Sequence, residues 1–395
     1  MQDFRSVILG GGMVAGYAAK ELAEQGLKPG ELGIISADNA LPYERPPLSK
    51  GFLAGEDSED SVFINDQAFY DEHGIEVRLR TRVASVDVGA RKLSLEGGDQ
   101  IGYEQLLIAT GAEVRTFNVP GADLAGIHYL RSLDDSRGIR DAKANAKQAV
   151  VIGAGFIGME VAAVLASGGL DVTLAFPEER VWSRFFAPEM SEFFENYYEK
   201  RGVKLRSGAM VTEFEGEDGH ISGVYAEDDL IPADLVVAGI GVKPVTGFLD
   251  GSGINVDNGI VVNEYLATNM EGVRAAGDVA NYQDVVFDKR RRVEHWDNAV
   301  EQGKLAGRLL AGKEEPFIHV PYFFSDVFDL SYEFWGDTEG TDRVEYRGDV
   351  ATGKFSAWWL RNGIVRAAFV MDRPDEEREA APTLIQEKRE LPNQF

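Results

Sequence analysis

Two glycine-rich segments of the chain have residue types and spacing suited to binding the phosphates of a dinucleotide. In each segment an apolar run is followed by closely spaced glycines and then by small residues in a helical pattern. The glycines permit a tight turn and a close approach of the backbone to a pyrophosphate, and the helix N-terminus offers free N–H groups. The predicted phosphate-binding residues are Gly10, Gly12, Met13, Val14 and Ala15 in the first segment, and Gly153, Gly155, Phe156, Ile157 and Gly158 in the second.

The repetition of this pattern is more informative than either copy alone. A single copy is weak evidence, because similar turns occur in many doubly wound proteins and Ala15 replaces the third glycine of the strict pattern. Two copies in one chain indicate two dinucleotide sites that face each other, with one cofactor passing electrons to the other.

Each glycine-rich segment is followed by a strand and then by an acidic residue that could bind a ribose. After the strand predicted at residues 32–35, Asp38 is the candidate, and the alternative is a solvated turn aspartate. After the strand predicted at residues 172–176, Glu178 would bind the 2′-OH of NADH and repel the 2′-phosphate of NADPH, with Arg184 further along. The alternative is that Glu178 and Arg184 are only surface charges.

Residues 41–53, LPYERPPLSKGFL, form a segment that three prolines should keep rigid and non-helical as far as Pro47. Its two cations, Arg45 and Lys50, suit a loop that holds a positive charge against a flavin. The segment resembles the signature of the FAD-dependent ferredoxin and rubredoxin reductases, a family that includes putidaredoxin reductase, apoptosis-inducing factor and monodehydroascorbate reductase. Ala37 departs from that family, which usually has a glutamate at this position.

The resemblance extends to residues that would contact the two cofactors. It implies that Arg45 contacts the adenosine half of FAD, that Lys50 lies beside the isoalloxazine, and that Glu160 reaches the flavin edge and pairs with Lys50. Lys50 and Glu160 would fix the local charge at N5, and Trp296 would shield one face of the ring. Further residues at matching family positions are Arg82, Val83, Ala109, Thr110, Gly111, Arg131, Ile240, Gly241, Gly277, Asp278, Glu294, His295 and Phe324.

Some of these residues have a structural alternative. Arg131 could be a surface arginine that pairs with Asp134 or Asp135, and Trp296 could be a plain core tryptophan. Asp278 ends a second FAD signature at residues 273–280, where its carboxylate would hold the ribityl chain.

The predicted fold class is α/β, with two Rossmann-like dinucleotide-binding domains, one for FAD and one for NADH, and a C-terminal α+β domain. Residues 1–116 and 246–315 would form the FAD domain, residues 117–245 the NADH domain, and residues 316–395 the last domain. Local patterns predict a helix at residues 297–311, a hairpin at residues 354–371 that turns at Asn362-Gly363, and a helix at residues 376–385.

Composition limits the class of partner. The chain has 395 residues, of which 44% are hydrophobic and 27% are charged, and its formal net charge is −26. This charge repels nucleic acid and anionic membranes, so neither is expected as a partner. No apolar run reaches the length of about 18 residues that suggests a membrane span, and the N-terminus does not resemble a signal peptide. A cytoplasmic monomer or homodimer is therefore expected.

The absence of cysteine limits the chemistry. It excludes a disulfide relay, a cysteine-based peroxidase, an iron–sulfur cluster and a cysteine–zinc site, and no metal site is predicted. The predicted enzyme moves electrons from NADH through FAD to a one-electron acceptor, preferably a ferredoxin or rubredoxin. The cationic run at residues 289–292 would dock such a small acidic carrier, unless these cations only offset neighbouring carboxylates.

Two other functions remain open. Monodehydroascorbate reductases resemble the chain at residues 292–295 and 321–334, but the arginine that serves their anionic radical falls at Val300, and Phe324 replaces a tyrosine. A protein similar to apoptosis-inducing factor would instead sense NADH and turn over slowly.

Overall fold

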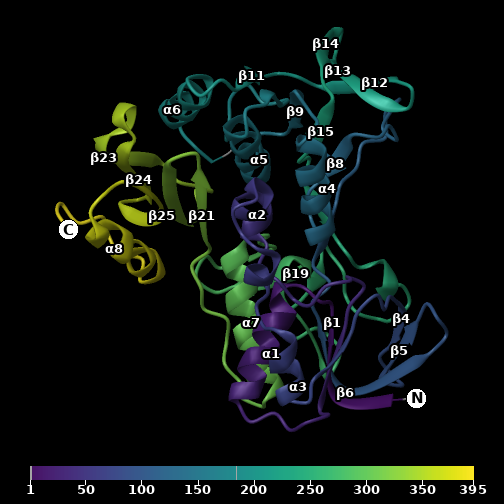
Figure 1. The fold of residues 1–395 in the computed structure, drawn as a ribbon. Helices are drawn as coiled ribbons and strands as arrows, with labels where there is room; N and C mark the ends of the chain where they lie inside the picture. The colour runs from purple at the N-terminus through teal and green to yellow at the C-terminus, as the bar shows by residue number, and fades with distance from the viewer. Residues whose placement is uncertain (1, 184) are drawn as a thin grey trace. The chain divides into compact units, whose positions relative to one another are not determined.

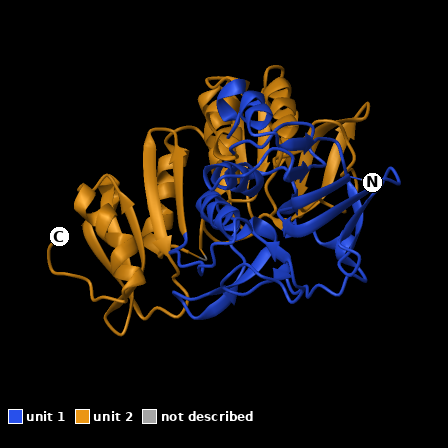
Figure 2. Cartoon of the chain, turned by 90° about the horizontal axis from the view of Figure 1, so that it is seen from below, with its two compact units in different colours: residues 1–44, 60–113, 243–321 blue, residues 45–59, 114–242, 322–395 orange. Residues whose placement is uncertain are grey.

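The computed structural model describes residues 2–183 and 185–395 of the chain (Figure 1). The chain forms two compact units, each assembled from three separate segments (Figure 2). Unit 1 comprises residues 1–44, 60–113 and 243–321, and unit 2 comprises residues 45–59, 114–242 and 322–395. Strands β7 (Ala112–Val114) and β16 (Val242–Pro244) lie where the chain passes from one unit to the other.

Unit 1 is built on a seven-stranded sheet with the order β3-β2-β1-β6-β5-β4, in which β18 also pairs with β6. Strands β1, β2, β3, β6 and β18 are parallel, whereas β4 and β5 form an antiparallel hairpin beside β6. The strands of this sheet are β1 (Gln2–Leu9), β2 (Leu32–Ile35), β3 (Glu76–Arg78), β4 (Val83–Asp87), β5 (Lys92–Leu95), β6 (Gln100–Ile108) and β18 (Val273–Ala275).

The other elements of unit 1 are three helices and a small sheet. The helices are α1 (Met13–Glu24), α3 (Gln67–Glu72) and α7 (Trp296–Leu310). The small sheet contains β17 (Ile260–Val261), β19 (Ala280–Asp284) and β20 (Lys289–Arg291).

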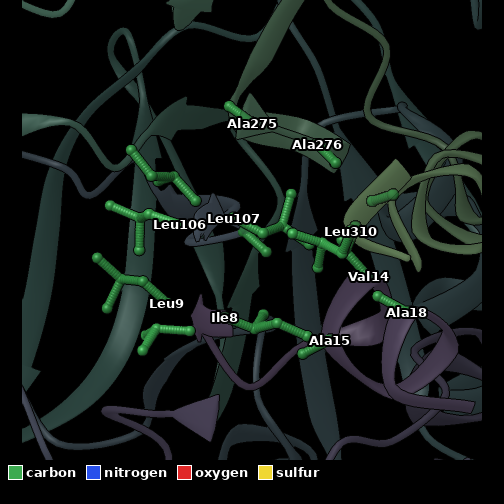
Figure 3. Close-up of a cluster of buried hydrophobic side chains, with 14 of the residues drawn as sticks. Ile8, Leu9, Val14, Ala15, Ala18, Leu106, Leu107, Ala275, Ala276 and Leu310 are labelled. Atoms are coloured by element: carbon green, nitrogen blue, oxygen red, sulfur yellow. The ribbon is translucent and has the colours of Figure 1, made fainter. Parts of the chain in front are cut away.

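Helices α1 and α7 pack side by side in the core of unit 1 (Figure 1). Figure 3 shows Val14, Ala15 and Ala18 of α1 beside apolar residues of the sheet, such as Ile8 and Leu107. The two helices approach closely because glycines of α7 face α1. A Cβ atom added at Gly307, for example, would lie 2.7 Å from the Cβ atom of Glu21.

Unit 2 contains a parallel sheet with the order β11-β10-β9-β15-β8, a three-stranded meander, and a five-stranded antiparallel sheet with the order β21-β22-β25-β24-β23. The strands of the parallel sheet are β8 (Ile127–Tyr129), β9 (Gln148–Ile152), β10 (Asp171–Ala175), β11 (Lys204–Arg206) and β15 (Leu235–Ala238). The meander contains β12 (Val211–Glu217), β13 (His220–Ala226) and β14 (Asp229–Pro232).

The antiparallel sheet and the helices complete unit 2. Its strands are β21 (Tyr322–Val327), β22 (Leu330–Gly336), β23 (Arg343–Asp349), β24 (Lys354–Arg361) and β25 (Ile364–Met371). The helices are α2 (Gly51–Ala54), α4 (Leu133–Lys143), α5 (Phe156–Ser167), α6 (Pro188–Glu199) and α8 (Asp375–Gln386). One face of the antiparallel sheet packs into a common core with α5 and α6.

The predicted fold class is confirmed, and many local predictions match the structure. The hairpin of β24 and β25 turns at Asn362 and Gly363, whose φ angles of 53° and 84° are those of a tight hairpin turn. The prediction of a non-helical segment as far as Pro47 is wrong, because a 3₁₀ helix begins at Pro46. Proline is tolerated there, since the first N–H group of a helix needs no partner within the helix.

None of the helices formed by the described residues is long and apolar enough to cross a membrane. The longest of them, α7, has 15 residues, whereas a membrane-spanning helix needs about 20 apolar residues.

The contact between α1 and α7 can be tested with Gly307→Ala. In an exposed helix this change would stabilise the protein by about 1 kcal/mol through helix propensity. Here the added methyl group would overlap the Ala18 carbonyl oxygen at 2.8 Å, so we expect a net loss of about 1–2 kcal/mol of unfolding free energy. Gly97→Ala is the matched control, since its Cβ atom would meet nothing within 4 Å. Equal unfolding midpoints in urea for both variants would contradict the close packing.

Candidate functional site

The first glycine of each predicted phosphate-binding segment lies where the strand order of its sheet reverses. Gly10 follows β1 and faces Ala109 after β6, and Gly153 follows β9 and faces Gly239 after β15. A Cβ atom at Gly10 would lie 2.2 Å from the Ala109 carbonyl oxygen, and one at Gly153 would lie 2.4 Å from that of Gly239. Ligands of open α/β sheets bind at such reversal points, outside the carboxyl ends of the strands.

The helix N-termini that follow these glycines suit a pyrophosphate. Gly12 and Gly155 are the N-caps of α1 and α5, and neither helix has a side-chain cap on its first N–H groups. A Cβ atom at Gly155 would meet nothing within 4 Å, so there is open space in front of α5. Gly158 packs the helix onto the strand, since its Cβ atom would lie 1.8 Å from the Gly153 carbonyl oxygen. The geometry therefore fits one dinucleotide in each unit.

Asp38 follows β2, and its carboxylate already accepts hydrogen bonds from residues of its own loop. Its Oδ1 atom accepts hydrogen bonds from the N–H groups of Asn39 and Ala40, at 2.7 and 3.3 Å. Its Oδ2 atom accepts the hydroxyl of Tyr43 at 3.0 Å, which leaves one acceptor position on Oδ2 for a ribose hydroxyl. Arg82, another predicted contact, is exposed and lies 3.7 Å from a carboxylate oxygen of Glu96.

A series of buried amide groups holds the loop that carries Asp278. Gly277, whose φ is 78°, donates its N–H group to Oε1 of Gln302 at 2.7 Å. The Gln302 amide in turn donates to Asn298 at 3.4 Å, and Asn298 donates to the Val293 carbonyl oxygen at 3.2 Å. Since both amide side chains lie on α7, this helix fixes the position of the loop.

The indole of Trp296, at the first position of α7, is held by a carboxylate that the sequence analysis missed. Trp296 Nε1 donates to Oε2 of Glu44 at 2.5 Å, and the Tyr17 hydroxyl donates to Oε1 of the same carboxylate. Burial and the hydrogen bond to Glu44 raise the pKa of Tyr17, so the phenol stays protonated and donates. Burial lowers the pKa of the neighbouring His295 to about 4, so its imidazole is neutral at pH 7.

In unit 2 the structure brings Lys50, Glu160 and Phe324 together. The Lys50 ammonium lies 2.9 Å from Oε1 of Glu160 and 5.0 Å from the centre of the Phe324 ring. The Glu160 side chain is only 5% exposed, so its charge needs close partners. Ser49 donates to Oε2 of this carboxylate, and Ser325 donates to Oε1 at 2.6 Å.

Neither serine was predicted. Ser49 precedes Lys50, and Ser325 follows Phe324, so both lie next to residues that the resemblance selects. Nothing in their spacing signals a hydrogen bond to Glu160, because they are separated from it by 111 and 165 positions in the chain.

Arg45, predicted at the adenosine half of FAD, and Arg131, predicted near the flavin, lie together in unit 2. Arg45 donates to the carbonyl oxygen of Arg131. The N–H group of Arg131 donates to Asp135 at 3.0 Å, and Asp134 pairs with Arg137. Both carboxylates that the sequence offers as partners of Arg131 thus lie close to it, at the start of α4.

The remaining predicted residues lie on turns, at strand ends or in the first turns of α1 and α5. Thr110 donates its hydroxyl to the Val245 carbonyl oxygen at 2.9 Å, and Gly111 and Gly241 have φ angles of 64° and 93°. Met13, Val14 and Ala15 lie in the first turn of α1, and Phe156 and Ile157 begin α5. Val83 begins β4, and Ile240 and Glu294 lie outside the helices and strands. Arg184 lies outside the described residues.

Phe176 and Glu178, the two residues considered for the second ribose, differ in exposure. Phe176, which directly follows β10 and stands at the usual acidic position, is fully buried in the core of unit 2. Glu178 is partly exposed two residues further on, where its carbonyl oxygen accepts the Gly208 N–H group at 3.0 Å.

The arginines of the cationic run at residues 289–292 make contacts within unit 1. Arg290 donates to the carbonyl oxygens of Val262 and Asn281, at 2.8 and 2.6 Å. Arg291 pairs with Asp284 at 3.3 Å, and both side chains are buried or nearly so. Arg292 pairs with Glu294 and donates to the Asp278 carbonyl oxygen. The structure therefore favours the alternative in which these cations stabilise unit 1 itself.

The described part of the chain, residues 2–183 and 185–395, contains no group of three His, Asp or Glu side chains that could hold a metal ion.

Comparison with known proteins places the chain in a family. The model of the pyridine nucleotide-disulphide oxidoreductases matches residues 4–303, and that of the monodehydroascorbate reductase 3-like C-terminal domain matches residues 320–394. The chain is 38% identical to the peroxisomal monodehydroascorbate reductase 2 of Oryza sativa subsp. japonica over 413 residues, which cover 99% of this chain and 86% of the relative.

Two solved structures are also similar. A ferredoxin reductase from Rhodopseudomonas palustris matches with a TM-score of 0.93 and 33% identity, covering 98% of this chain and 96% of that one. A chain of the covalent putidaredoxin reductase–putidaredoxin complex matches with a TM-score of 0.93 and 32% identity, covering 98% and 93%.

The fold and the two phosphate-binding turns define a flavoprotein with paired dinucleotide sites. The chain belongs to the pyridine nucleotide-disulphide oxidoreductase family and is an FAD-dependent oxidoreductase that uses NAD(P)H. The predicted family, enzyme class and cofactors are thus confirmed. Because the chain has no cysteine, it cannot itself carry out the disulfide chemistry of the family name.

The buried ion pair predicts a characteristic pattern of stability. Lys50→Met would leave the Glu160 charge with only hydroxyl donors, so we expect a loss of about 3–5 kcal/mol of unfolding free energy. The double variant Lys50→Met/Glu160→Gln removes the charge as well and should recover about half of that loss or more. Urea unfolding of the FAD-free protein would measure both. A double variant as unstable as the sum of its single changes would contradict this account.

Proposed function

We propose that the protein is an NADH-dependent reductase that passes electrons singly to a small electron-carrier protein of the ferredoxin or rubredoxin type. The similarity over 98% of the chain to a ferredoxin reductase and to putidaredoxin reductase supports this assignment. Bound FAD would supply the means to take up a hydride from NADH and to release its electrons singly.

Within this proposal the Lys50–Glu160 pair supplies a fixed charge beside the flavin. The carboxylate holds the ammonium at 2.9 Å, and the Phe324 ring limits its movement on another side. Trp296, held by Glu44, would shield one face of the flavin, and Asp278 would hold the ribityl chain. Gly10, Gly12 and the α1 N-terminus bind the FAD pyrophosphate, whereas Gly153, Gly155 and the α5 N-terminus bind that of NADH.

The proposed acceptor depends above all on the residue types at two positions that, by the resemblance, serve the anionic radical in monodehydroascorbate reductases. By the resemblance, the arginine that serves this radical falls at Val300, which is 3% exposed within the core of unit 1. The second position holds Phe324, which lacks a hydroxyl group. A small anionic acceptor would lack one charged and one neutral hydrogen-bond donor.

Monodehydroascorbate reduction is the second candidate, because two comparisons favour it. The chain is 38% identical to a monodehydroascorbate reductase over nearly its whole length. The C-terminal residues 320–394 also match a domain model named after such enzymes.

An acceptor panel would distinguish the two functions. We expect the FAD-loaded protein to reduce at least one ferredoxin or rubredoxin with NADH at a kcat/KM about tenfold or more above that for monodehydroascorbate. Phe324→Tyr restores the hydroxyl group and should raise the rate with monodehydroascorbate while leaving the carrier rate within about twofold.

The control for this panel is flavin reduction by NADH without any acceptor. If reduction is fast but no carrier is reduced above background, or if monodehydroascorbate is the better acceptor, the carrier assignment is wrong. A long-lived reduced state that no acceptor reoxidises would instead favour a slow NADH sensor.

The proposal also specifies NADH rather than NADPH. Glu178 is the acidic residue after β10 that would bind the ribose 2′-OH and repel a 2′-phosphate. We expect kcat/KM to favour NADH by about tenfold or more, and Glu178→Ala to narrow this ratio by raising the KM for NADH and lowering that for NADPH. Glu179→Ala, a change at the exposed neighbour, is the control and should leave the ratio unchanged. Equal use of both nucleotides by the parent protein would refute the assignment.

A further inference from the structure

The carboxylate of Glu160 receives donors from two segments that are distant in the sequence. Residues 45–59 supply Ser49 to one oxygen and Lys50 to the other, at 2.9 Å. Ser325, from β21, donates to the same oxygen as Lys50 at 2.6 Å. The Lys50 ammonium and the Ser325 hydroxyl therefore share Oε1 of Glu160. The hydrogen bond from Ser325 consequently limits the directions from which the ammonium can approach this oxygen.

Ser325 occupies a position where the packing favours an apolar residue. Its side chain is fully buried, and its neighbours on the same face of β21, Phe323 and Val327, belong to the hydrophobic core of unit 2. A buried hydroxyl without a strong partner destabilises such a core. The bond to an ionised carboxylate is a strong partner, and it gives this serine a role that an aliphatic residue could not fill.

Two tyrosines also lie near Glu160, and one of them, Tyr332, is close enough to interact with the Ser325 hydroxyl as well. Tyr198 on α6 and Tyr332 on β22 are both close enough to interact with the Glu160 charge. Burial raises the pKa of each phenol well above its usual value, so both remain neutral. Among the described residues, Lys50 is the cation that pairs with Glu160.

We propose that Ser325 is a positioning residue for the flavin-side ion pair, because it fixes the orientation of the Glu160 carboxylate and thereby places the Lys50 ammonium. This inference rests on the flavin-side role proposed above for Lys50 and Glu160. It assigns to the C-terminal segment a part in the reaction with NADH, in addition to any part in acceptor choice. The adjacent Phe324 confines the same ammonium, so two consecutive residues of β21 act on one charge.

The test compares Ser325→Ala with Ser325→Thr, which keeps a hydroxyl group. The matched control is Ser356→Ala, since Ser356 is fully buried in the same antiparallel sheet but accepts its hydrogen bond from Trp358 at 2.8 Å. Three quantities are measured on the FAD-loaded protein. They are the limiting rate of flavin reduction by NADH, the apparent Kd of NADH, and the midpoint potential of the bound flavin.

We expect Ser325→Ala to lower the limiting reduction rate about tenfold or more, and to change the apparent Kd of NADH by less than about twofold. The midpoint potential should also shift, because the fixed charge beside the flavin has moved. Ser325→Thr should recover most of the parent rate, and Ser356→Ala should match the parent in all three quantities.

Several results would overturn the inference. One such result is flavin reduction at the parent rate in Ser325→Ala. Another is an equally slow flavin reduction in Ser356→Ala, which would show a general effect of losing a buried hydroxyl group. If Ser325→Ala does not retain FAD, Ser325→Thr becomes the deciding variant. Slow flavin reduction in a folded, FAD-loaded Ser325→Thr protein would also overturn the inference. Lys50→Met separates the two proposals. A slow Lys50→Met beside a normal Ser325→Ala refutes only the inference, whereas normal rates in both refute the proposed role of the ion pair as well.

Discussion

The ionised carboxylate of Glu160, in a nearly dry interior, is the constraint on which much of unit 2 depends. An unpaired buried charge costs several kcal/mol, so the chain must bring donors to it from wherever the sequence has them. Residues 45–59 therefore pack within unit 2, although the segments before and after them belong to unit 1. The antiparallel C-terminal sheet contributes Ser325 to the same carboxylate, and its apolar face shares a core with α5 and α6.

A second constraint is the close approach that both phosphate-binding turns require. In each unit the first glycine abuts a carbonyl oxygen across the reversal point of the sheet, at a distance that no Cβ atom could tolerate. Helices α1 and α7 also pack closely, because Gly303 and Gly307 face the backbone of α1. Because α7 also holds the Asp278 loop through Gln302, the close helix packing extends into the proposed flavin site.

The fold does not choose the electron acceptor. The chain is similar in sequence to a monodehydroascorbate reductase and similar in structure to ferredoxin reductases, with nearly complete coverage in each comparison. Similarity of fold therefore does not identify the acceptor, because one fold can carry different functions. The arginines at residues 290–292, which the sequence suggested as a dock, also make hydrogen bonds and ion pairs within unit 1.

The sequence by itself determined what depends on short-range spacing. Strand β2, helix α7, the Asn362-Gly363 turn and both glycine turns could be predicted, because each is encoded within about twenty consecutive residues. Lys50 and Glu160 were matched through a family resemblance, not through their own spacing. Only the tertiary structure decided their partners Ser49 and Ser325, the Glu44 clamp on Trp296, the burial of Phe176 and the internal use of the arginines. These depend on which distant segments meet, and a serine or a glutamate carries no local signal of the group it will bond.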